Sequence, residues 1–194
     1  MPAQKSKMNM VWIDLETSGL NVNDRVILEI ATIVTDKDLN VIAEGPDLVI
    51  HQPDKALAAM DGWCMKQHRA SELIDEVRHS TISLAQAEEE TLAFVSLYCP
   101  PRSCPLCGNA ICFDRRFLIQ YMPKLDELLS YRNVDVSTVK ELVTRWRPEE
   151  MKMIGNSKTS KHRARSDILE SIAELRHYQN AVFQRGPAQS QKGA

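Results

Sequence analysis

The stretch VWIDLETSGL, Val11 to Leu20, joins an apolar run to two acidic residues, Asp14 and Glu16. The run predicts a strand, and residues i and i+2 of a strand point to the same side. Two adjacent carboxylates repel each other unless a proton or a cation lies between them, and Mg²⁺ and Mn²⁺ prefer such oxygen ligands. The stretch therefore favours a metal site at the end of a strand. The alternative is that Asp14 starts a turn closed by Gly19 while Glu16 is solvated.

The sequence on either side predicts an α/β fold that begins with an antiparallel meander. Short turns separate three predicted strands, at Met10–Leu15, Arg25–Val34 and Val41–Ile50. Two shorter strands are also predicted. One lies within Pro105–Asp114, which places Cys112 on a strand, and the other is at Asn133–Val136. Four helices are predicted. The first is Ser83–Tyr98 with Ser83 as its N-cap, and the second runs from Asp114 to a break near Pro123. The third runs from a capping box of Thr138 and Glu141 to Trp146, and the last is Ala164–Val182. We expect residues 147–161 to form a polar loop, residues 8–184 to form one domain, and residues 1–7 and 185–194 to be disordered tails.

Composition and charge limit the classes of protein that this chain can be. Of its 194 residues, 43% are hydrophobic and 26% are charged, which is typical of a globular domain. Neither a membrane-spanning run nor the apolar core of a signal peptide is visible, so we expect a cytoplasmic protein, with a mitochondrial one as the alternative. The net charge of −2 argues against a protein that coats long nucleic acid, duplexes included, but allows a local site for a small anion.

Two further acids and a histidine follow the first pair along the chain. Asp114 lies at a predicted strand-to-helix junction, and Asp167 lies in the first turn of the last predicted helix, five residues after His162. Either acid alone is explained by the preference of carboxylates for helix N-termini. Together with Asp14 and Glu16 they form an ordered set: Asp-x-Glu on the first strand, Asp in mid-chain, then His-x₄-Asp.

In this set and in its surroundings, the chain resembles the oligoribonucleases of the DEDDh exonuclease superfamily. The resemblance covers nearly all of residues 10–180, through the segments WIDLETSGL, EIATIVTD, EGPDLVIHQP, AMDGWCMKQH, PLCGN, DRRFLIQYMPKL, YRNVDVSTVKEL and HRARSDILESIAELRHY. It implies an RNase H-like fold, in which a mixed sheet with three antiparallel strands first is flanked by helices. It also implies a homodimeric 3′-to-5′ exoribonuclease that cleaves short RNA, chiefly dinucleotides, to nucleoside 5′-monophosphates.

The resemblance assigns roles residue by residue. It implies that two divalent cations, Mg²⁺ or Mn²⁺, are bound by Asp14, Glu16, Asp114 and Asp167, and that His162 is the general base. Two such cations roughly 4 Å apart can bridge a phosphate, activate water and stabilise the leaving oxygen. A histidine, whose unperturbed pKa is about 6.5, can accept the proton of the water near neutral pH.

Substrate contacts are also implied by the resemblance. Leu20 is expected to wedge against the bases, with Trp63 and His68 nearby. A partner subunit is expected to cap the 5′ phosphate with Tyr131, Arg132, Ser137 and Lys140, which are suitable phosphate ligands. On residue type alone, core packing explains Leu20 and Trp63, and a solvated surface explains Arg132 and Lys140.

The chain departs from the family pattern at several positions, none of them catalytic. Thr17 and Ser18 stand where Met and Thr are expected, Ala110 and Phe113 where Ser and Gln are expected, and Arg165 and Ser166 where Leu and Asp are expected. Ala110 can remove a substrate hydrogen bond, and Arg165 can change how the loop before it packs.

Two alternatives of other kinds also follow from the sequence. Cys99, Cys104, Cys107 and Cys112 have a spacing that could bind zinc or an iron–sulfur cluster, although free thiols are the simpler interpretation. A 3′-to-5′ exonuclease on single-stranded DNA and a catalytically silent RNA-binding protein are the alternative functions. The silent protein is disfavoured because no metal acid is missing.

Overall fold

The core of the protein is a five-stranded mixed sheet with the strand order β3-β2-β1-β4-β5. The computed structural model describes residues 5–153 and 163–183, so the tail residues 1–4 and 185–194 and the predicted base His162 lie outside the described residues. β1 pairs antiparallel with β2 and parallel with β4, and β3 and β5 form the edges. The predicted antiparallel order of the first three strands is therefore confirmed. The strands are β1 Met10–Thr17, β2 Ile27–Thr35, β3 Val41–Val49, β4 Leu106–Gly108 and β5 Asn133–Asp135.

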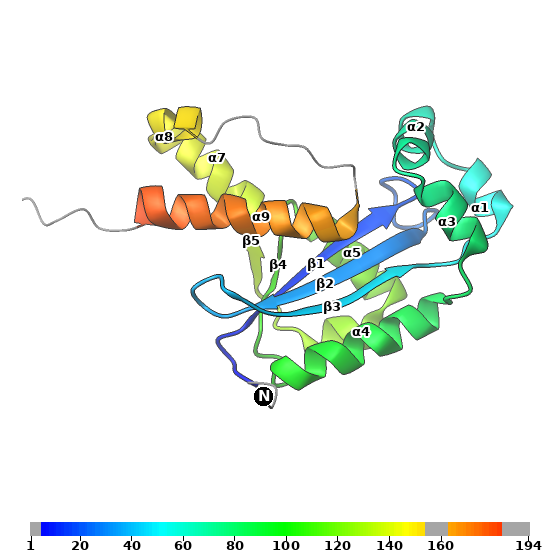
Figure 1. The fold of residues 1–194 in the computed structure, drawn as a ribbon, viewed down its shortest axis with the longest axis horizontal. Helices are drawn as coiled ribbons and strands as arrows, with labels where there is room; N and C mark the ends of the chain where they lie inside the picture. The colour runs from blue at the N-terminus through cyan, green and yellow to red at the C-terminus, as the bar shows by residue number, and fades with distance from the viewer. Residues whose placement is uncertain (1–4, 154–162, 184–194) are drawn as a thin grey trace, which may run out of the picture.

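One face of the sheet packs against three helices, α4, α5 and α6. Because residues of a strand alternate between its two faces, Val11, Ile13 and Leu15 of β1 lie on this face. There they are buried in one cluster with Val95 of α4 and Phe117 of α5. Figure 1 shows α4 lying along the lower side of the sheet, with α5 behind the strands. These helices are α4 Leu84–Tyr98, α5 Cys112–Tyr121 and α6 Pro123–Leu128.

The opposite face packs against α9, with α7 and α8 beside it (Figure 1). Trp12 lies on this face, fully buried, in one cluster with Ile168 and Ile172 of α9. Because residues of a strand alternate, Asp14 and Glu16 continue the Trp12 row and point toward the α9 face. The elements are α7 Val136–Trp146, α8 Pro148–Met153, α9 Ala164–Tyr178 and a terminal π-helix, η1 Gln179–Phe183.

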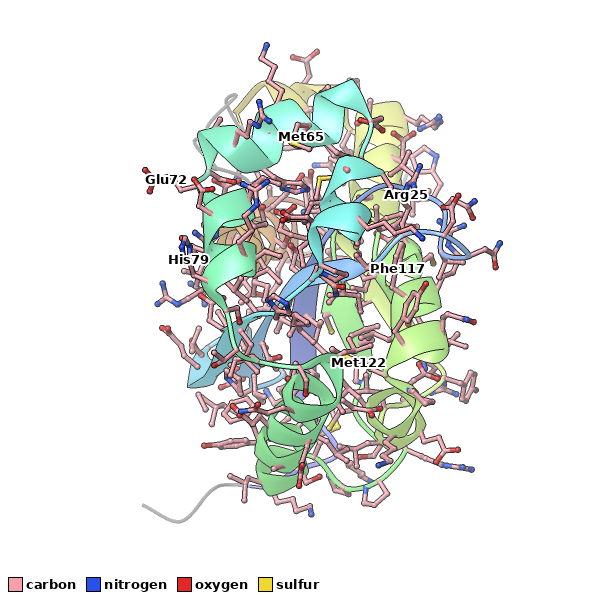
Figure 2. All side chains as sticks on the ribbon, turned by 90° about the vertical axis from the view of Figure 1, so that its right-hand side faces the viewer. Arg25, Met65, Glu72, His79, Phe117 and Met122 are labelled. Carbon is pink, nitrogen blue, oxygen red and sulfur yellow. The ribbon has the colours of Figure 1, made fainter. Side chains whose placement is uncertain are left out.

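Three short helices gather at one end of the sheet, beyond the last residues of β1. Figure 2 looks at this end, where Met65 marks α2 and Glu72 and His79 mark the two ends of α3. Their apolar residues pack with Leu28 of β2 in a cluster of their own. The helices are α1 Asp54–Ala58, α2 Gly62–Ala70 and α3 Leu73–His79. In the described part of the chain, no helix is long and apolar enough to cross a membrane.

Three local predictions were wrong. Cys112 begins α5 instead of lying on a strand. The predicted polar loop contains α8, which starts at Pro148, a residue that suits the first turn of a helix. Helix α7 starts before the predicted capping box: Asp135 is its N-cap and accepts from the Ser137 backbone N–H at 3.0 Å. By contrast, the predicted N-cap Ser83 is confirmed, since its hydroxyl accepts from the Gln86 N–H.

Candidate active site

Three carboxylates meet where β1 ends beneath the first turn of α9. Oxygens of Asp14, Glu16 and Asp167 all lie within 4.8 Å of one another. Asp14 and Glu16 reach this point because they are two residues apart on one strand, and Asp167 reaches it because α9 crosses the same face of the sheet. Among the described residues, this is the one group of three or more possible ligands close enough to hold a metal ion.

A fourth acid, Asp114, lies close enough to this group for its charge to act on Asp14 and Glu16. It lies in the first turn of α5, is 5% exposed, and accepts a hydrogen bond from the Leu15 backbone N–H at 3.0 Å. Close packing between β4 and β1 makes this possible: a Cβ atom on Gly108 would lie 3.3 Å from the Ile13 carbonyl oxygen and 2.8 Å from Ile111 Cδ1. The missing side chain at position 108 thus lets the junction that carries Asp114 approach β1.

The pKa values of Asp14, Glu16 and Asp114 are all raised. Burial, followed by repulsion from Asp114, Glu16 and Asp167, raises the pKa of Asp14 well above its usual value. Burial and the charges of Asp167, Glu29 and Asp114 raise the pKa of Glu16 from 4.5 to about 8. The pKa of Asp114 is also raised, chiefly by burial, although its hydrogen bond from Leu15 opposes the shift.

This charge pattern fits a bound cation. Carboxylates packed this closely in a partly buried site carry a repulsion that a divalent cation would neutralise. The ligands are all oxygens, which suits hard cations such as Mg²⁺ and Mn²⁺. Because protons compete with the cation for the same oxygens, cation binding should weaken as the pH falls.

His68 lies against the cluster as a buried neighbour. Its Nε2 is 2.9 Å from the Thr17 carbonyl oxygen, which can only accept, so Nε2 carries a proton. Its Nδ1 is 3.8 Å from Glu16 Oε2. His68 was predicted as a substrate contact, and the structure places it buried next to Glu16.

Leu20 and Trp63, the other two predicted base contacts, are on the surface. Leu20 is 75% exposed just after the end of β1, and Trp63 on α2 is 64% exposed. Core packing, the alternative explanation for both residues, is therefore excluded. Exposed apolar side chains of this size are typical of binding surfaces.

The predicted phosphate ligands divide into two pairs. Tyr131 is 81% exposed, and the guanidinium of Arg132 stacks 5.3 Å from its ring centroid. Ser137 and Lys140 already have partners within the protomer: the Ser137 hydroxyl donates to Asn109 Oδ1 at 3.0 Å, and Lys140 Nζ lies 3.2 Å from a Glu174 carboxylate oxygen.

One residue of the site region was missed by the sequence reasoning. Glu29 is fully buried on β2, directly opposite Glu16 in the strand register. Its side chain contacts Arg163 and the first backbone N–H of α9. The available signal was a lone glutamate within the apolar strand sequence ILEIATIVT.

The cysteine alternative finds no support in the geometry. Cys99, Cys104 and Cys107 are buried, whereas Cys112 is exposed at the start of α5, and all are free thiols. Among the residues that the structure describes, they do not form a cluster of possible metal ligands.

Comparison with known proteins identifies relatives along almost the whole chain. A family model described as an exonuclease, RNase T, matches residues 11–175. The chain is 53% identical over 176 residues to an oligoribonuclease of Pseudomonas paraeruginosa, covering 91% of this chain and 97% of that protein. It is 52% identical over 188 residues to an oligoribonuclease of Alkalilimnicola ehrlichii, covering 97% and 96% of the two chains.

Solved structures share the fold at much lower sequence identity. A structure of exonuclease I superimposes with a TM-score of 0.71 at 16% identity, covering 89% of this chain. An exonuclease I from Methylocaldum szegediense gives a TM-score of 0.64 at 19% identity. This chain corresponds to 41% of the length of each of those two proteins.

Proposed function

The chain belongs to the exonuclease family and, within it, to the oligoribonucleases, as a 3′-to-5′ exonuclease of short oligonucleotides; from this premise we propose how its site works. Residues 8–184 form a single exonuclease domain, and the preferred substrates are RNA dinucleotides, which are hydrolysed to nucleoside 5′-monophosphates in the cytoplasm.

The acidic cluster holds two divalent cations, Mg²⁺ or Mn²⁺. The observation that carries this proposal is the meeting of three carboxylates within 4.8 Å. They come from β1 and α9, which lie near opposite ends of the chain, and the buried Asp114 is close to them. Asp14, Glu16, Asp114 and Asp167 are the ligands. When bound, the cations supply charge that stabilises the reacting phosphate and activates the attacking water.

Other groups of the protein position the ligands and accept the proton of the water. Leu15 holds Asp114 through its backbone N–H, and His68 covers one side of Glu16. His162 accepts the proton of the attacking water, as a histidine can do near neutral pH. Its sequence position, next to the helix that carries Asp167, supports this role.

Selection of short substrates depends on both ends of the bound oligonucleotide. Leu20 and Trp63 present exposed apolar surface to the bases, and the buried His68 lies on the same helix as Trp63. In a homodimer, Tyr131, Arg132, Ser137 and Lys140 of one subunit cap the 5′ phosphate in the site of the other. The exposure of Tyr131 and Arg132 on their own protomer supports a role toward a partner.

One set of assays tests these points together. A 5′-labelled RNA dinucleotide, a longer RNA oligomer and a DNA dinucleotide are each incubated with the protein, with and without EDTA. We expect rapid, EDTA-sensitive hydrolysis of the RNA dinucleotide and slower hydrolysis of the other two. Asp14→Ala should abolish turnover without unfolding the protein, because it removes both a ligand and a repelling charge.

Each alternative function predicts a different outcome. Preference for DNA would indicate a single-stranded DNA exonuclease, and binding of RNA without EDTA-sensitive hydrolysis would indicate a silent binding protein. Activity of purified Asp14→Ala close to that of the wild type at saturating Mg²⁺ would contradict the assignment of the acidic cluster.

A further inference from the structure

Glu29 is an acidic side chain in the interior of the protein, and Arg163 and the start of α9 donate hydrogen bonds to it. It has no solvent exposure, yet Arg163 Nε donates to one carboxylate oxygen at 2.9 Å and the Ala164 backbone N–H donates to the other at 3.1 Å. A buried carboxylate is stable only with such compensation. Glu29 therefore has a specific structural task at the start of α9.

That task includes capping the helix. The N-cap position of α9 is occupied by Arg163, which makes no side-chain capping bond, and the first N–H groups of a helix have no partner within the helix. Glu29 supplies the missing acceptor from β2. The first turn of α9 is thus fastened to a particular residue of the sheet.

Arg163 extends this fastening to a second element. Its two terminal nitrogens donate to the two carboxylate oxygens of Glu76 on α3, each at 2.8 Å. One guanidinium therefore joins β2, α3 and the start of α9. A bidentate contact of this kind restrains orientation as well as distance.

The strand register connects this arrangement to the acidic cluster. Glu29 is directly opposite Glu16 in the β1–β2 pairing, and opposite residues of an antiparallel pair project from the same face. Asp167 lies one helical turn after Arg163, and its N–H donates to the Arg163 carbonyl at 3.1 Å. The same residue that neighbours Glu16 thus fixes the turn that carries Asp167.

We propose that Glu29, Arg163 and Glu76 form a positioning triad that sets the distance from Asp167 to Asp14 and Glu16. The proposal rests on the proposed function only in taking Asp167 as a cation ligand. It predicts that loosening the triad weakens cation binding and the chemical step, while substrate binding is preserved.

Variants of Arg163 test the proposal. Arg163→Met removes the side-chain contacts with both Glu29 and Glu76, whereas Arg163→Lys keeps the charge but cannot make the fork with Glu76. Arg165→Met is the matched control, because it breaks an exposed pair with Glu44 at the same helix start. Mn²⁺ binding is measured by titration with electron paramagnetic resonance, without substrate, and kcat and KM are measured on the RNA dinucleotide.

Arg163→Met should weaken Mn²⁺ binding and lower kcat by about 10- to 100-fold each, the usual effect of removing a residue that orients a metal ligand. KM should change little, Arg163→Lys should be intermediate, and Arg165→Met should behave as the wild type. Folding of each variant is checked by circular dichroism. If Arg163→Met does not fold, Arg163→Lys alone decides the question.

Folded Arg163 variants with Mn²⁺ affinity and kcat within about twofold of wild type would overturn the triad, since orienting residues usually cost more. Equal losses in the Arg165→Met control would also overturn it. Asp167→Asn distinguishes this failure from that of the proposed function: full activity of Asp167→Asn would refute the ligand assignment itself.

Discussion

Replacing Glu16 with glutamine should stabilise the metal-free protein at neutral pH. Burial, with the charges of Asp167, Glu29 and Asp114, raises the pKa of Glu16 from 4.5 to about 8. When the pKa of a group is higher in the folded than in the unfolded chain, the free energy of unfolding is highest at pH values below the unfolded pKa. It falls as the pH rises from the unfolded pKa to the folded pKa, because the folded chain then has to keep a proton that the unfolded chain has released. The window of pH in which the wild type loses stability therefore runs from about 4.5 to about 8.

The size of the effect follows from the same two values. A carboxyl group with these pKa values opposes folding by about 1 kcal/mol at pH 5 and about 4 kcal/mol at pH 7.5, relative to a neutral side chain. For a chain of this size, each kcal/mol corresponds to about 2–4 °C in Tm. Glu16→Gln should therefore raise Tm by up to about 8–16 °C at pH 7.5, and by only about 2–4 °C at pH 5.

The assay is thermal unfolding followed by circular dichroism in EDTA, at several pH values between 5 and 7.5. Glu89→Gln, at an exposed position of α4, is the control for loss of one negative charge. Addition of Mn²⁺ should raise the Tm of the wild type and should raise that of Glu16→Gln much less. A Tm difference between Glu16→Gln and the wild type that does not increase with pH would refute the electrostatic reasoning.

Four further predictions concern catalysis, substrate length and one backbone position. His162→Ala should lower kcat by roughly 10²–10⁴, the usual contribution of a general base, and flatten the acidic limb of the pH–rate profile; an unchanged limb would exclude His162 as the base. Arg132→Ala should cost more on 5′-phosphorylated dinucleotides than on longer RNA, because only a terminal phosphate fits a closed cap; equal losses in kcat/KM would contradict the cap. Mixing Asp114→Ala with Arg132→Ala subunits should partly restore dinucleotide activity, since one of the two sites then carries neither defect; no recovery despite proven subunit exchange would rule against a cap in trans. Ala110→Gly should raise stability by about 0.5–1 kcal/mol in urea unfolding, because Ala110 has a φ of 51°; a lower midpoint would show that its methyl group contributes packing that outweighs the strain.

Local patterns in the sequence were sufficient for the first three strands and the longer helices. Apolar runs predicted β1 to β3, and their short connections predicted antiparallel pairing, because both signals come from neighbouring residues. Ser83 was correctly predicted as a cap for the same reason. The prediction that a capping box at Thr138 starts the helix was wrong. Asp135, three residues earlier at the end of β5, is the N-cap instead.

The acids themselves were visible in the sequence, but their contacts were not. Spacing on one strand was enough to place Asp14 beside Glu16. The position of Asp114 depends on the close approach of β4 to β1 at Gly108, and the buried place of His68 depends on how α2 packs against the end of β1. These are contacts between residues far apart in the chain, which no local pattern encodes.

The sequence by itself determined the family, the residue types of the site and the strand that carries its first two acids. The resemblance implied that Asp167 shares a cation site with Asp14 and Glu16, and the structure brings their carboxylates together. Only the tertiary structure decided that Glu29 reaches the start of α9 from β2. The physical reason is that propensity and periodicity act over a few residues, whereas the separation of charges on different elements is set by packing across the sheet. The charge on Glu29 is accommodated in the interior because folding brings Arg163 and the start of α9 to it.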